Sequence, residues 1–135
     1  MKISLLVLLL VNYKITYVTI QEYKEAYKLY KSGSDEVTYY YGKIGEQNEQ
    51  ICSSQHDSEL FNRAKLLGST KAIFSGHDHY NNLSIEYEGI RLTYGMSIDY
   101  LAMPGISKKS EQRGGTLITL HSDSSFDILP IPLNK

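Results

Sequence analysis

The chain has 135 residues, of which 41% are hydrophobic and 21% are charged, a composition typical of one globular domain with a real core. Its formal net charge is −1 and its Lys and Arg residues form no basic stripe, so we do not expect nucleic acid as a partner. The single cysteine, Cys52, excludes an intramolecular disulfide scaffold and a cysteine-rich zinc site.

The N-terminal segment, residues 1–16, is open to two interpretations. Its apolar run, residues 3–11, follows one lysine and has the length of a secretory signal's apolar region, about 7–15 residues. The alternative is a buried strand of a parallel sheet, because no small-x-small cleavage site follows the run. We expect a secreted or lumenal protein if residues 1–11 are a signal and a cytoplasmic one otherwise. Membrane anchoring by residues 3–11 is less favoured, because a span takes about 20 residues.

The next part of the chain predicts a strand, a helix and a loop. Residues 14–20 are rich in β-branched residues, which is typical of a strand. Aromatic and apolar residues at helical spacing predict a helix over residues 21–31, with Gly33 as its stop signal. Residues 32–50 are polar and contain three glycines, so we expect a long loop there.

A second helix is predicted over residues 57–67, with Asp57 or Ser58 as its N-cap. Its apolar face consists of Leu60, Phe61, Ala64 and Leu67. After Gly68, short apolar or alternating runs predict strands over residues 71–74, 83–87, 90–94, 116–121 and 126–129. Glu88-Gly89 predicts a hairpin turn, and residues 96–113 have no regular pattern. Early helices and a later antiparallel meander predict an α/β fold with a mixed sheet.

The candidate site is Gly76-His77-Asp78-His79, directly after the apolar strand at residues 71–74. Imidazole binds Zn, Fe, Mn or Ni ions without carrying charge, so His77 and His79 are the predicted metal ligands. We expect a turn at Gly76 to bring both imidazoles to one cavity at the end of the strand. Asp78 and Asn81 are predicted to support these ligands by hydrogen bonds rather than to bind metal.

The segment KAIFSGHDHYNN, residues 71–82, resembles the last metal-binding motif of the calcineurin-like metallophosphoesterase family, in particular its purple acid phosphatase-related subgroup. Residues 90–95 and 112–118 are similar to the closing strands of that subgroup. Residues 20–26 and 49–60 are similar to segments that precede its final motif. The resemblance covers roughly residues 17–121.

The resemblance implies that residues 17–135 are the C-terminal part of a four-layer α/β/β/α metallophosphoesterase sandwich. It implies a dinuclear centre of Fe, Zn or Mn ions, with His77 on one metal and His79 on the other. Such a centre hydrolyses phosphate esters with a metal-activated water, its two metals about 3.5–4 Å apart. The earlier family motifs, Asp-x-His, Gly-Asp and Gly-Asn-His, do not occur here, and Tyr17 stands near the place of the family's isolated histidine.

We therefore expect a metal-dependent phosphoesterase by resemblance that is incomplete as an enzyme in this chain. One alternative is a non-catalytic pseudoenzyme or binding remnant of the fold. Another is a mononuclear metal-binding protein that uses His77 and His79 with His121 or His56. An unfinished sheet also predicts association of the chain through an exposed apolar edge.

Overall fold

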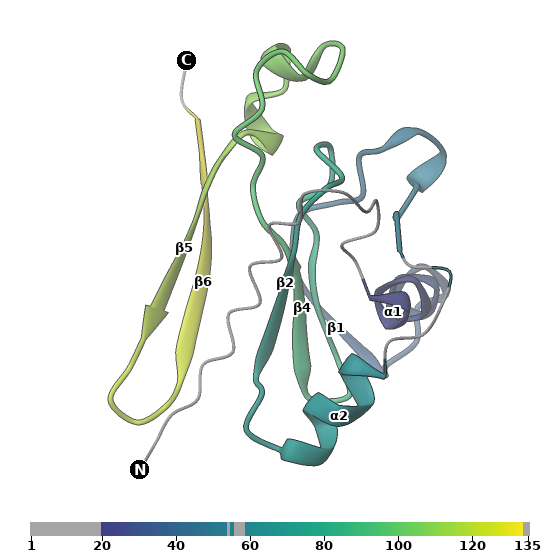
Figure 1. Ribbon diagram of the computed structural model, residues 1–135, viewed down its shortest axis with the longest axis vertical. Helices are drawn as coiled ribbons and strands as arrows, with labels where there is room; N and C mark the ends of the chain where they lie inside the picture. Colours follow the sequence, from purple (N-terminus) through teal and green to yellow (C-terminus); the bar gives the residue numbers. More distant parts are fainter. Residues whose placement is uncertain (1–19, 54, 56–58, 134–135) are drawn as a thin grey trace.

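The computed structural model describes residues 20–53, 55 and 59–133. Two α-helices, α1 (Gln21–Ser32) and α2 (Leu60–Leu67), lie on one side of a four-stranded sheet. A two-stranded ribbon stands on the other side (Figure 1). None of the helices in this described part is both long and apolar enough to cross a membrane. The predicted α/β class with a mixed sheet is confirmed, and the layers are compatible with a partial α/β sandwich.

The four-stranded sheet has the order β1-β3-β4-β2. Its strands are β1 (Val37–Tyr41), β2 (Ala72–Ser75), β3 (Ser84–Tyr87) and β4 (Ile90–Tyr94). The pairs β1–β3 and β3–β4 are antiparallel, and β2–β4 is parallel. The ribbon pairs β5 (Gly114–Leu120) with β6 (Phe126–Pro132). Three short 3-10 turns complete the described elements: η1 (Gln47–Glu49), η2 (Ile106–Lys108) and η3 (Ser110–Gln112).

Several elements form as their local patterns predict. Helix α1 matches the predicted helix, and Gly33 ends it in the left-handed conformation that glycine adopts without strain. Strands β2, β3 and β4 lie within one residue of their predicted positions. Glu88 and Gly89 both have positive φ, +49° and +78°, as a two-residue hairpin turn requires.

The long loop predicted over residues 32–50 is wrong in part, because it contains β1. This strand pairs with β3 from Val37 opposite Tyr87 to Tyr41 opposite Ser84, with an irregularity after Tyr39. Its Val-Thr-Tyr-Tyr-Tyr sequence suits a strand, but an edge position leaves its middle side chains exposed. The sequence of β1 therefore lacks the alternation of apolar and polar residues by which a strand is recognised.

Helix α2 and the ribbon also differ from the prediction. Helix α2 begins at Leu60, because Glu59 has a left-handed backbone with φ +56°. Leu67, predicted for the apolar face, is 72% exposed. Strand β6 continues through Pro130 to Pro132, which the ribbon tolerates because an edge strand leaves some N–H positions unpaired.

Some predictions lie outside the described residues. They concern the apolar run at residues 3–11, the strand at residues 14–19, Tyr17, His56 and the cap at residues 57–58. Association through an apolar edge stays a prediction. Strand β2 forms one edge of the sheet, with β4 as its partner on the inner side.

The core lies between the helices and the sheet. Its buried side chains come from both helices and from the central strands: Tyr23, Ala26, Phe61, Ala64, Ile85, Leu92 and Tyr94. Alternate residues of a strand point to opposite faces of the sheet. On the face of β3 and β4 that points away from the helices, these residues are polar. There the Arg91 Nε donates to Ser84 Oγ at 2.8 Å, and the guanidinium lies 3.5 Å from the ring centroid of Tyr40.

Tyr23 links α1 to the sheet through a buried phenol. Its hydroxyl donates to the Leu83 carbonyl at 2.5 Å, and its ring lies 4.9 Å from the ring of Tyr94. Burial, with the neighbouring Tyr94 phenol, raises the pKa of Tyr23 well above its usual value. A pKa raised by folding means that the folded state holds its proton more tightly than the unfolded state. The protonated Tyr23 phenol therefore stabilises the folded state fully at pH values below its pKa in the unfolded chain, about 10. This stabilisation is lost as the pH rises towards the pKa of Tyr23 in the folded chain.

Tyr23→Phe is expected to lower the free energy of unfolding by about 1 kcal/mol at neutral pH, through loss of one buried hydrogen bond. The cost stays moderate because the Leu83 carbonyl also accepts the Tyr94 N–H at 3.0 Å. The difference in unfolding free energy between the variant and wild type should shrink at about pH 11. At that pH the unfolded wild-type chain is stabilised by ionisation of Tyr23, which the phenylalanine variant lacks. Urea unfolding at both pH values measures this, with the exposed Tyr100→Phe as control. An unchanged difference between the two pH values would contradict it.

Candidate metal site

The candidate site lies where two parallel strands end side by side. Strands β2 and β4 pair in parallel, so the chain segments that follow them leave the same edge of the sheet. In α/β sheets this edge is the usual place for ligand sites. The two segments, residues 76–79 and 95–99, line one cavity of about 390 Å³. His77 and His79 therefore lie on the same cavity, together with Asp78 and Asp99.

His77 is the residue at which the backbone turns. The turn was predicted at Gly76, but it is His77 that has a positive φ, +78°. A non-glycine residue in this region costs on the order of 1 kcal/mol or more and needs support from its surroundings. Part of that support is the 3.0 Å contact between His77 Nδ1 and Asp78 Oδ1.

Asp78 is the buried anchor of the loop, with a side chain only 3% exposed. Its Oδ2 accepts the Tyr94 hydroxyl at 2.5 Å and the Cys52 N–H at 2.9 Å. These donors offset the cost of removing the carboxylate from water. They also tie the loop to β4 and to the segment around Cys52, so Asp78 links His77 to both of these segments.

His79 is held by a residue that sequence reasoning missed. Its Nδ1 lies 2.7 Å from Asp99 Oδ2. The Asp99 carboxylate also accepts backbone N–H groups of Leu101, Ala102 and Met103. The hydrogen bond from His79, with these three N–H groups, lowers the pKa of Asp99 well below its usual value. Residues 96–113 have no regular sequence pattern that would single out Asp99. Asp99 reaches the histidine loop because β2 and β4 pair in parallel and end side by side.

Both imidazoles therefore present the same chemistry. A carboxylate accepts a hydrogen bond from the Nδ1–H of each ring, and this assigns the tautomer in which Nε2 keeps its lone pair. Carboxylate–histidine pairs of this kind orient metal-binding rings and raise their basicity. The side chains of His77 and His79 are 38% and 36% exposed, so both remain accessible from the cavity side.

Asn81 ties the histidine loop to the chain segment before it. Its Oδ1 accepts the N–H groups of Gly45 and Glu46, at 3.0 and 3.1 Å. Its Nδ2 donates to the Gln50 carbonyl at 3.1 Å and lies 3.4 Å from Asp78 Oδ2. The side chain is fully buried. The supporting roles of Asp78 and Asn81 in metal binding stay predictions, but both residues lie directly behind the loop.

The described residues contain one group with the spacing of metal ligands: Cys52, His77 and Asp78. Their ligand atoms all lie within 4.8 Å of one another. His121 is not brought to this place, because its Nε2 contacts Asp127 Oδ2 on the ribbon at 2.8 Å. The two carboxylates lining the cavity each accept several hydrogen bonds, so this donor set fits one metal ion better than two bridged ions.

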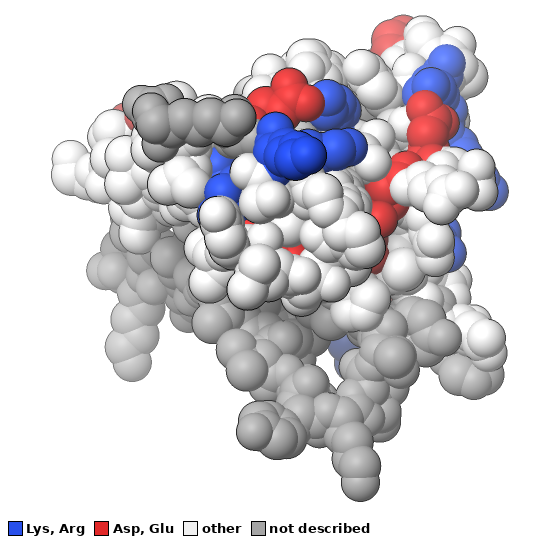
Figure 2. All heavy atoms as spheres, turned by 90° about the horizontal axis from the view of Figure 1, so that it is seen from above, with Lys and Arg blue, Asp and Glu red and all other residues white. Residues whose placement is uncertain are grey.

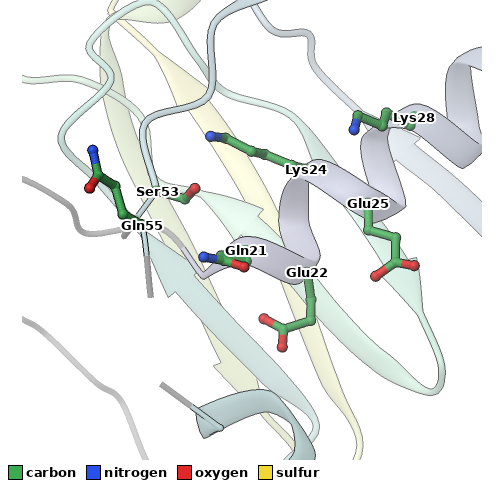
Figure 3. A pocket seen from close by; sticks show the side chains of 7 residues that line it. All are labelled: Gln21, Glu22, Lys24, Glu25, Lys28, Ser53 and Gln55. Carbon is green, nitrogen blue, oxygen red and sulfur yellow. The ribbon is translucent and has the colours of Figure 1, made fainter. Parts of the chain in front are cut away.

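A larger cavity, of about 720 Å³, lies beside α1 and has a different character. Figure 3 shows Lys24 pointing toward Ser53 and Gln55, whereas Glu22 and Glu25 point away from them. Both signs of charge also alternate on the face of the molecule seen in Figure 2. Neither feature has the convergent donors of the histidine loop.

Comparison with known proteins finds a sequence match over part of the chain. Over 56 residues, 42% of this chain, the sequence is 38% identical to a protein of Arabidopsis thaliana named "Probable inactive purple acid phosphatase 14". The chain covers only 14% of that relative's length. No protein family model and no solved structure matches the chain. These findings support a relation to the phosphoesterase family over part of the chain.

Proposed function

We propose that this chain carries the histidine loop of a metallophosphoesterase-type site, and that His77 and His79 bind a metal ion there. The observation that carries the proposal is the pair of imidazoles on one cavity, each held at Nδ1 by its own carboxylate. The partial identity to a protein named as a probable inactive purple acid phosphatase supports a relation to the family. The metal would be Zn²⁺, Mn²⁺ or an iron ion, which are ions that imidazole accepts.

The chain's own residues prepare the site before any ion binds. Asp78 and Asp99 each accept a hydrogen bond from Nδ1 of one ring, so each ring offers Nε2 as its ligand atom. Tyr94 and Cys52 hold Asp78, and the backbone of residues 101–103 holds Asp99. A metal ion bound there would supply Lewis-acid polarisation of a phosphate oxygen and a more acidic bound water.

Hydrolysis of a phosphate ester demands more than the described residues supply. A two-metal mechanism needs a carboxylate that bridges both ions. Of the carboxylates lining this cavity, Asp78 is buried and bonded to Tyr94 and Cys52, and Asp99 caps its own loop. We therefore propose metal binding without efficient hydrolysis for this chain alone. Phosphate ester hydrolysis would require further ligands from residues outside this cavity.

Two measurements on the purified chain test this function. By isothermal titration calorimetry, His77→Ala is expected to weaken Zn²⁺ binding at least about tenfold, because one ligand is lost. The control is His121→Ala, which removes a histidine from the ribbon and should leave the affinity unchanged. With p-nitrophenyl phosphate and Mn²⁺, Zn²⁺ or Fe²⁺, wild type should be no faster than His77→Ala.

Equal Zn²⁺ affinity of wild type and His77→Ala would contradict the metal role of the loop. A metal-dependent hydrolysis rate clearly above that of His77→Ala would contradict the non-hydrolytic part of the proposal. It would show that the missing ligands are supplied elsewhere in the chain.

A further inference from the structure

The sole cysteine of the chain lies beside the histidine loop. The backbone N–H of Cys52 donates to Asp78 Oδ2 at 2.9 Å, which fixes residue 52 against the loop. The Sγ atom of Cys52, a ring nitrogen of His77 and a carboxylate oxygen of Asp78 all lie within 4.8 Å of one another. Three different donor types from two distant chain segments thus lie close to one another.

The charge of Asp78 is a second, independent observation. Its side chain is 3% exposed, and within the described residues His77 lies at ion-pair distance from it, with Nδ1 3.0 Å from Asp78 Oδ1. No Lys or Arg of this part of the chain lies within ion-pair distance of its carboxylate. The hydrogen-bond donors around Asp78 offset the cost of its burial but leave its negative charge, which a bound divalent ion would neutralise.

We propose that the Cys52 thiolate joins His77 as a direct ligand of one divalent ion of the zinc class, with Asp78 as the anchor that holds both residues. Sulfur and imidazole nitrogen donors suit Zn²⁺, which takes tetrahedral sites with Cys and His ligands. On binding, the thiol gives its proton to solvent and the sulfur bonds to the ion. Asp78 keeps its role as the anchor of the loop, and its negative charge balances part of the charge of the ion.

This inference deepens the proposed function and rests on it only for the metal role of His77. It differs in its ligand chemistry, because the two-histidine site alone offers no sulfur. A thiolate ligand favours zinc-class ions over Mn²⁺, whereas nitrogen and oxygen donors alone discriminate less.

Cobalt(II) absorption of the whole chain tests the proposal, because a thiolate bound to Co²⁺ gives a near-ultraviolet charge-transfer band. The chain has one cysteine, so such a band has a single origin. We expect the band together with visible bands of tetrahedral Co²⁺ in wild type. Cys52→Ser should abolish the charge-transfer band and weaken Co²⁺ binding at least about tenfold. His121→Ala should leave both unchanged.

A second measurement needs no variant and covers the case in which Cys52→Ser fails to fold. Bound Zn²⁺ is expected to slow alkylation of Cys52 in the wild-type chain at least about tenfold, as followed by mass spectrometry. Visible Co²⁺ bands that depend on His77 without a charge-transfer band, and alkylation unaffected by Zn²⁺, would overturn this inference and leave the proposed function standing. No Co²⁺ binding at all would overturn both.

Discussion

Asn81→Ala is expected to lower the free energy of unfolding by about 3 kcal/mol, one of the two largest effects that this structure predicts. The buried amide accepts two backbone N–H groups, from Gly45 and Glu46, and donates to the Gln50 carbonyl. Alanine leaves these groups without their partner, and each unsatisfied buried group costs about 1–3 kcal/mol. It also removes a donor beside Asp78. Chemical unfolding followed by circular dichroism measures the change.

The matched control for this variant is Asn62→Ala on the exposed side of α2. It makes the same chemical change at the surface, where substitutions stay within about 0.5 kcal/mol. If Asn81→Ala were as stable as Asn62→Ala, the segment around residues 45–50 would not be held by this amide, and the support of the histidine loop described above would be wrong.

Asp78→Asn is expected to weaken Zn²⁺ binding by about 10–100-fold, the second large effect. Asparagine has nearly the same shape and keeps an oxygen for the Tyr94 hydroxyl and the Cys52 N–H. The variant loses the negative charge that orients His77 and attracts the cation. The affinity loss should therefore exceed any loss of folding stability, and calorimetry together with thermal unfolding separates the two.

Asp127→Asn is the matched control, because Asp127 forms the same kind of pair with His121 on the exposed ribbon. We expect it to leave Zn²⁺ affinity unchanged. An equal loss in both variants would mean that the ion responds to general surface charge and not to the Asp78 site. An unchanged Zn²⁺ affinity in Asp78→Asn would show that Asp78 has no role in metal binding.

Local sequence patterns were sufficient where the structure depends on neighbours along the chain. Helix α1 needs only its own spacing and Gly33, and the hairpin needs only Glu88-Gly89 between two apolar runs. The histidine pair was found in the same way, because it follows β2 directly. Its place on one cavity with the end of β4 follows from the parallel pairing of the two strands.

Features that depend on distant parts of the chain were missed. Strand β1 needs β3 as its partner, and its exposed tyrosines hide the strand pattern. Asp99 and Cys52 reach the histidine loop only through the folded arrangement, across 20 and 26 residues from their partners His79 and Asp78. The left-handed backbone of His77, instead of Gly76, is a consequence of the contacts that fix this loop.

The central claim is that the loop of residues 76–79 binds a metal ion. Crystals of the chain grown with Zn²⁺ and measured at the zinc absorption edge test it most directly. The account predicts one strong anomalous peak at bonding distance from His77 on the cavity between β2 and β4. An anomalous peak at His121 and Asp127 with none at His77, or no peak from a crystal saturated with Zn²⁺, would contradict it.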